Sequence, residues 1–202
     1  EFYRQERSDL EEKLKNEKEV AVNLRKILSG GPFPGMGTGD ADFYKAFCWR
    51  FLSLTNQVNG FMGLVLPRGA LAAKGSEEFR WEIFSSSRRV DATLILNNRN
   101  WFFDDVHPQY TVGLIAIKLG HSDTNETILY LEGPYNSLSA YESRKDGGGA
   151  NFEGKEVLSW NDAACIPLLP SEQSLSIFAQ LRESPRLDLN KEDQWRARPH
   201  SE

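Results

Sequence analysis

Three aromatic residues stand in a row in the connector between two apolar runs of the sequence. Trp101, Phe102 and Phe103 follow the run 90–96 and precede the run 110–119. A connector of this length is long for a hairpin, and its aromatic content is too high for an ordinary solvent-exposed loop. Two interpretations remain open: the rings plug the end of a sheet, or they offer flat apolar faces to a ligand.

The glycine-rich segment 30–40 has the composition of a cofactor-binding loop. Such a loop needs a strand directly before it and a helix after it, so that backbone amides face an anionic group. A charged segment and Pro32 precede its glycine-rich part, residues 33–40, instead. We therefore do not predict a cofactor loop here.

A third pattern has the spacing of a metal-dependent endonuclease. Asp146 is followed by Glu153-Gly154-Lys155, and such carboxylates hold Mg²⁺ while a lysine supports the attacking water. In those enzymes the residues normally lie on a strand, whereas here they flank the triple glycine 147–149. An endonuclease piece is kept as an alternative, and no metal site is predicted.

The composition limits the remaining possibilities. A chain of 202 residues with 40% hydrophobic content supports one domain, or a domain with an appendage. Its net charge of −5 gives no overall basic footprint, so nucleic-acid contacts would need a local patch. Cys48 and Cys165 lack metal-type spacing, which predicts reduced thiols in a cytoplasmic protein. No apolar run approaches the roughly 20 residues that span a bilayer.

The periodicity of the apolar residues predicts an α/β fold. Residues 1–28 carry apolar side chains three or four positions apart, which predicts an exposed helix packing by one face. Residues 61–66 are apolar on both faces, as in a central parallel strand covered on two sides. Ser76 can begin the next helix, with Arg80 on its polar side. With the runs 90–96 and 110–119, this order predicts the back half of an open α/β sheet.

Four segments, in this order, resemble the gamma-class DNA adenine methyltransferases, especially those of large type IIG and related restriction–modification enzymes. The segment 39–47 is similar to their Gly-Asp-x-Asn-x-Tyr-x-x-Phe motif, and the segment 60–67 resembles their next strand. The segment 97–104 resembles their Glu-Asn-Arg-x-x-x-Phe-Pro motif, and 110–119 matches the closing strand. The segments 132–135 and 169–185 also fit, so the resemblance covers residues 30–200.

The sequence departs from that family at single positions and in its extent. Asp42 stands where the family has Asn, Asn97 where it has Glu, and Asp104 where it has Pro. The glycine-rich S-adenosylmethionine loop and the catalytic Asn-Pro-Pro-aromatic tetrapeptide of the family do not occur between Glu1 and Glu202. The resemblance thus implies the C-terminal half of a methylase domain: a partial Rossmann-like sheet of mixed strands with flanking helices, inactive alone.

The resemblance also implies an organisation and roles for single residues. Residues 1–29 would be a charged helix, 30–120 the methyltransferase-like half, and 121–202 an extension and linker. The chain would serve a DNA adenine methyltransferase that uses S-adenosylmethionine, with no catalytic residue of its own. The expected contacts are target-base stacking by Phe103 or Phe102, the cofactor's adenine by Phe43 and Tyr44, and backbone phosphates by Arg68 and Lys74. Core packing or an ordinary surface position is the other interpretation of each.

A non-catalytic interaction module is the second alternative to the methylase. The strand 61–66 would lack a neighbour, and an apolar unpaired edge favours association. We therefore expect self-association through that strand, or coverage of it by the helix 1–28.

Overall fold

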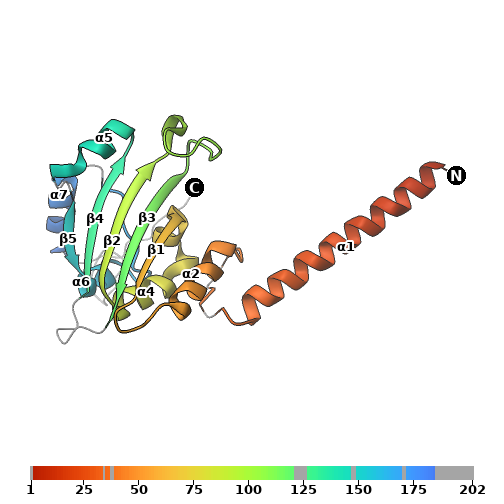
Figure 1. Cartoon of the computed structure of the whole chain (residues 1–202), viewed down its shortest axis with the longest axis horizontal. Helices are drawn as coiled ribbons and strands as arrows, with labels where there is room; N and C mark the ends of the chain where they lie inside the picture. Colours follow the sequence, from red (N-terminus) through yellow and green to blue (C-terminus); the bar gives the residue numbers. More distant parts are fainter. Residues whose placement is uncertain are drawn as a thin grey trace, which may run out of the picture.

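A five-stranded mixed sheet, backed by helices, forms the frame of the chain (Figure 1). The structure is a computed structural model that describes residues 2–33, 35–36, 39–120, 127–146, 149–169 and 172–184. The predicted class, an α/β fold with a partial mixed sheet and flanking helices, is confirmed.

The strands are arranged in the order β1-β3-β2-β4-β5. β3 lies antiparallel between β1 and β2, which therefore share a direction, while β4 is parallel to β2 and antiparallel to β5. Their bounds are β1 Phe61–Pro67, β2 Ser87–Leu96, β3 Thr111–Leu119, β4 Ile128–Tyr135 and β5 Ala150–Glu153.

Helices connect the strands and lie mainly on one side of the sheet (Figure 1). The α-helices are α1 Phe2–Gly30, α2 Phe43–Leu54, α3 Arg68–Ala72, α4 Glu77–Ser86, α5 Leu138–Glu142, α6 Gly154–Trp160 and α7 Glu172–Arg182. Three 3-10 turns complete the list: η1 Lys74–Ser76, η2 Asn98–Asn100 and η3 Ser143–Asp146.

The core lies between the sheet and the helices α4 and α6. Alternate strand residues point into it, as the period of two requires. Its fully or nearly buried members include Met62, Leu66, Val90, Ala92, Leu94, Ile115, Ile117, Leu129, Leu131, Phe79, Ile83, Phe84 and Val157.

β1 differs from the predicted central parallel strand. Among the described residues it is an edge strand that pairs antiparallel with β3, and Phe61 and Val65 on its second face are 72% and 60% exposed. Both faces of β1 are apolar, as predicted, but only the face of Met62 and Leu66 is covered. We call the sheet surface that carries Phe61 and Val65 the open face.

Arg80 corrects the prediction for α4. The sequence places it on the polar side of the helix, yet it is fully buried. Its guanidinium donates to the carbonyls of Ala70 and Ala73 at 2.8 Å and of Ala163 at 2.9 Å. These carbonyls lie where α3 ends and where the chain leaves α6, and a buried carbonyl needs a donor.

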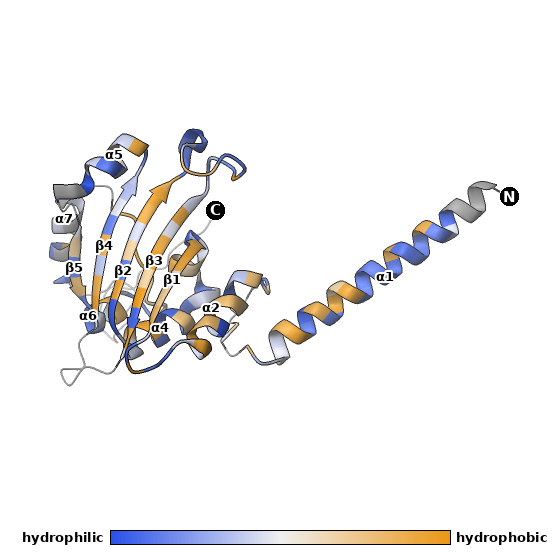
Figure 2. Ribbon diagram, viewed as in Figure 1, coloured by the Kyte–Doolittle hydropathy of each residue, from blue (hydrophilic) through white to orange (hydrophobic). Residues whose placement is uncertain are grey.

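α1 extends away from the sheet instead of packing by one face (Figure 1). Apolar and charged residues alternate along it (Figure 2), and Leu10 is 65% exposed. Only its last turn joins the body, where Leu28 is buried with Met36 and Ala46. α1 therefore does not cover β1. Among the described residues no helix is long and apolar enough to cross a membrane.

Candidate functional site

A single buried side chain, Asn97, fixes the aromatic connector at the carboxyl end of β2. Its Nδ2 donates to the carbonyls of Phe103 at 3.0 Å and Val106 at 2.9 Å. Its Oδ1 accepts from the amides of Phe102 at 3.2 Å and Phe103 at 2.9 Å. Both donors and both lone pairs of the carboxamide are thus used, so the loop backbone is held from four points.

The backbone at the start of the connector is strained. Arg99 and Asn100 adopt left-handed conformations with φ of 60° and 54°, which costs on the order of 1 kcal/mol or more for a non-glycine residue. The Asn100 side chain donates to the Asp104 carbonyl at 2.7 Å, and Trp101 Nε1 donates to the Leu96 carbonyl at 2.6 Å. These bonds stabilise one conformation of the connector.

The three aromatic rings pack edge to face. The ring centroids of Trp101 and Phe102 lie 5.4 Å apart, with an angle of 72° between the ring planes. Those of Phe102 and Phe103 lie 4.7 Å apart, with an angle of 88°. Phe102 also contacts Tyr141 of α5 at 6.4 Å. All three aromatic residues of the connector are half-buried. They are therefore partly packed against the protein and partly accessible to solvent.

Phe103 lines an apolar cavity at the carboxyl end of β1. The cavity has a volume of about 310 Å³, at the lower end of the range for small-molecule sites. In open α/β sheets, ligands bind beyond the carboxyl ends of strands, which is where this cavity lies. Its walls are Val65, Leu66, Pro67, Phe103, Val106, Tyr110, Thr111 and Val112.

The two residues expected at the cofactor differ in environment. Phe43 begins α2 and is exposed, whereas Tyr44 packs towards α3 and α4. The Tyr44 hydroxyl lies 3.2 Å from Ser76 Oγ, and burial raises the pKa of the tyrosine. The space beside Tyr44 is only about 10 Å³, which is close to the minimum for one water molecule. An adenine ring does not fit on that side of Tyr44.

The two residues expected at DNA phosphates are both exposed. Arg68 directly follows Pro67, a wall of the cavity, and so lies beside it along the chain. Lys74 lies on η1, after α3. The structure thus brings Phe102, Phe103 and Arg68 to one end of the sheet, while Phe43 and Tyr44 lie on α2.

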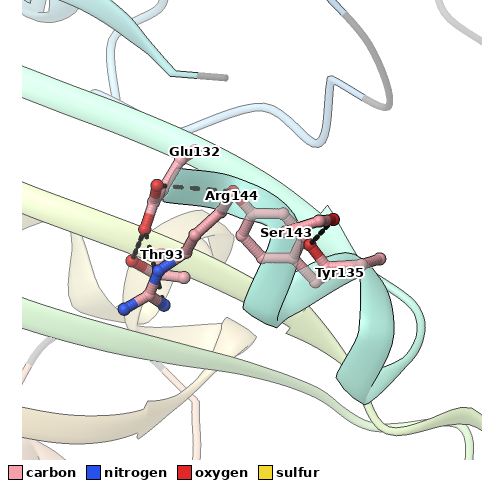
Figure 3. Close-up of polar contacts among 6 residues, drawn as sticks. Thr93, Glu132, Tyr135, Ser143 and Arg144 are labelled. Atoms are coloured by element: carbon pink, nitrogen blue, oxygen red, sulfur yellow. Dashed lines mark hydrogen bonds and ion pairs between the residues drawn. The ribbon is translucent and has the colours of Figure 1, made fainter. Parts of the chain in front are cut away.

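A polar cluster on β4 was not found from the sequence (Figure 3). Glu132 is buried, and its carboxylate accepts from Thr93 Oγ1 at 2.5 Å and from the Tyr135 hydroxyl at 3.3 Å. Burial, with the nearby carboxylate, raises the pKa of Tyr135 to about 12. Thr93 and Glu132 face each other in the parallel register of β2 and β4, a pairing that only the strand order reveals.

Two residues of the endonuclease alternative, Glu153 and Lys155, form an ion pair. Lys155 Nζ lies 2.7 Å from the Glu153 carboxylate, and both side chains are well exposed. The side chain of Asp146 is outside the described residues. Among those that are described, no group of three or more acidic, histidine or cysteine side chains could hold a metal ion.

The two cysteines are unpaired thiols in different settings. Cys48 is buried in the core, and burial raises its pKa to about 12. Cys165 is half-buried, and its Sγ donates to the Ala72 carbonyl at 3.0 Å. The environment of Cys48 therefore disfavours the reactive thiolate form.

Comparison with known proteins gives a likeness of fold alone. No family model and no curated protein matches this chain. A solved structure with a similar fold is the methyltransferase subunit of the type I restriction-modification system from Streptococcus thermophilus, at 18% identity and a TM-score of 0.41. The similarity covers 68% of this chain and 32% of that one, so the chain spans about a third of the subunit's length. Likeness at this TM-score carries no functional argument, and the function has to be inferred from the chain's own residues.

Proposed function

We propose that this chain supplies the target-base side of the active site of a restriction–modification DNA adenine methyltransferase. The observation that carries the proposal is the Asn97-held connector, which sets Phe103 at the apolar cavity beyond β1. The parent reaction would transfer a methyl group from S-adenosylmethionine to the adenine amino group. This chain contributes no catalytic residue to it.

The physical requirements of base binding agree with this site. An enzyme that acts on a base within a duplex extrudes that base into a pocket and stacks it on apolar side chains. Stacking requires a flat ring and no hydrogen-bonding group, and it contributes about 1–3 kcal/mol per base. Phe103 has such a ring, and the perpendicular Phe102 ring at 4.7 Å restrains its rotation. Phe102 is therefore the supporting ring and Phe103 the stacking ring.

The other contacts in the proposal follow from position. Arg68, beside the cavity wall Pro67, would contact a backbone phosphate of the bound strand. Lys74 would make a phosphate contact further along the surface. Phe43 would form one wall for the cofactor's adenine, with Tyr44 behind it as a support.

The test uses a single-stranded DNA oligonucleotide that carries one 2-aminopurine, a fluorescent adenine analogue. An unpaired base needs no extrusion, so the chain alone can bind it. We expect 2-aminopurine fluorescence to change on binding, and Phe103→Ala to weaken that binding about fivefold or more, given about 1–3 kcal/mol per stacked base.

The matched control is Phe47→Ala, which removes an exposed phenylalanine of α2. We expect this variant to bind as the unchanged chain does. Equal fluorescence titrations for Phe103→Ala and the unchanged chain would refute the stacking role.

One observation favours the alternative of a non-catalytic interaction module. Phe43, Phe47 and Phe51 form an exposed apolar stripe along α2, a helix that contacts β1. A surface of this kind marks a site of protein association. An interaction module would keep this stripe and show no dependence of base binding on Phe103, so the same titration separates the two functions.

A further inference from the structure

The Arg144 side chain is fixed from two sides above the sheet. Its guanidinium lies 3.8 Å from the centre of the Tyr141 ring, and its Nη1 lies 4.0 Å from a Glu132 carboxylate oxygen. Figure 3 shows the side chain reaching from η3 over β4 towards Thr93 of β2. A stacked and ion-paired arginine loses little further freedom when it binds a ligand.

Glu132 is itself a rigid anchor for this arginine. Its side chain is 11% exposed and is held by Thr93 and Tyr135. A buried carboxylate requires a nearby positive charge, which explains why Arg144 lies here. This requirement alone would be met by any cation near Glu132.

Balancing the charge of Glu132 does not account for the whole arrangement of Arg144. The 4.0 Å separation from Glu132 is an ion pair and is longer than a direct hydrogen bond. The Arg144 side chain is 35% exposed, so guanidinium N–H groups face solvent. A planar fork of such donors matches the oxygens of a phosphodiester.

The position of Arg144 connects it to the proposed base site. Tyr141, on which Arg144 stacks, contacts Phe102 at 6.4 Å and Trp101 at 6.5 Å. Phe102 in turn contacts Phe103 at 4.7 Å. Consecutive ring contacts thus lead from the guanidinium to the cavity, along the carboxyl ends of β2 and β4.

We propose that Arg144 binds a phosphate of the DNA strand next to the nucleotide whose base stacks on Phe103. The inference rests on the proposed function, because it takes the strand held at Phe103 as the ligand. Arg144 thereby positions the strand, while Glu132 and Tyr141 position Arg144.

The experiment measures the affinity of the 2-aminopurine oligonucleotide by fluorescence anisotropy over a series of salt concentrations. Each neutralised phosphate of a single strand contributes about 0.7 to the slope of log affinity against log salt. We expect Arg144→Gln to lower that slope by about 0.7 and to weaken binding about fivefold at low salt. Arg144→Lys keeps the charge and should keep the slope, with a smaller loss of affinity because the planar fork is gone.

A matched control separates a specific contact from the loss of one positive charge. Arg50→Gln removes an exposed arginine of α2, and we expect it to leave the slope unchanged. An unchanged slope for Arg144→Gln, or an equal fall for Arg50→Gln, overturns the inference. If Arg144→Gln does not fold, Arg144→Lys decides: affinity equal to that of the unchanged chain overturns the proposed fork.

The two proposals fail differently in this experiment. A Phe103-dependent fluorescence change with no effect of Arg144→Gln on the slope removes the phosphate contact alone. A lowered slope for Arg144→Gln with no effect of Phe103→Ala keeps the phosphate contact and removes base stacking. Absence of binding by the unchanged chain removes both.

Discussion

On each face of the sheet a buried polar side chain bonds to backbone groups, but the two bonded regions differ. On the covered face, buried Arg80 donates to carbonyls of α3 and of the segments that follow α3 and α6. At the end of the open face, buried Asn97 satisfies the backbone of a loop whose rings remain half-exposed. In both places a buried polar side chain replaces water as the partner of backbone groups. The first arrangement stabilises the core, and the second presents side chains to a ligand.

The largest effect is expected on the covered face, from Arg80→Met. This change keeps much of the side-chain volume but removes the guanidinium bonds to the carbonyls of Ala70, Ala73 and Ala163. The Ala73 carbonyl keeps the Ser76 amide as a donor at 3.1 Å. Each of the two carbonyls left without a donor costs about 1–3 kcal/mol, so the free energy of unfolding should fall by about 2–6 kcal/mol. Urea denaturation followed by circular dichroism measures this.

Arg80→Lys is the matched control for that prediction. A lysine ammonium can reach fewer of the three carbonyls than the guanidinium fork does, so its loss should lie between those of the unchanged chain and Arg80→Met. If Arg80→Met unfolds at the same urea concentration as the unchanged chain, the three carbonyls do not depend on Arg80 for stability.

A smaller and more local effect is expected from Asn97→Ala. The change removes four hydrogen bonds of the connector, yet the loop lies at the surface and water can replace part of them. We expect a loss of about 1–3 kcal/mol, together with loss of amide hydrogen-exchange protection at Phe102 and Phe103.

The control for Asn97 is Asn151→Ala, which truncates an exposed asparagine of β5. It should change stability by less than about 0.5 kcal/mol. Asn97→Ala should also abolish the Phe103-dependent 2-aminopurine signal. Retention of that signal would show that Phe103 reaches its position without Asn97, and the contrast between the two faces would then be lost.

The comparison also shows which features a sequence can predict. β1, β2 and β3 were predicted because alternation and apolar runs are local patterns, and the connector was found because its aromatic residues are unusual for a loop. Arg80 was assigned to the polar side because its helix period puts it there, while its carbonyl partner at Ala163 lies 83 residues away in sequence. The pairing of Thr93 with Glu132 depends on β4 lying beside β2, although β3 comes between them in the sequence. Such long-range polar partners are not predictable from local patterns. The partners of Asn97 lie only five to nine residues away, but no periodicity marks an asparagine whose side chain bonds to a loop backbone.

The smallest effect on stability, and the last test of the contrast, concerns the edge of the open face. Among the described residues β1 has a strand neighbour on one side only, and Phe61 next to that edge is 72% exposed. An apolar, unpaired edge strand favours pairing with another chain, so we expect the protein to self-associate through residues 61–66. Phe61→Glu places a carboxylate within reach of Lys118, which now lies over the Phe61 ring at 5.4 Å. The free energy of unfolding of the monomer should therefore change by less than about 1 kcal/mol, as at other exposed positions.

Sedimentation velocity at increasing protein concentration measures that association. Phe61→Glu should shift the protein to the monomer, because a charge on an edge strand opposes edge-to-edge pairing. Leu10→Glu is the control, since Leu10 is 65% exposed on α1 and a charge there would break association through that helix instead. A monomer at every concentration, or association abolished by Leu10→Glu and kept by Phe61→Glu, would show that the β1 edge is not the contact. Association that only Phe61→Glu abolishes would instead place the contact at β1, where the apolar residues of the open face reach the sheet edge.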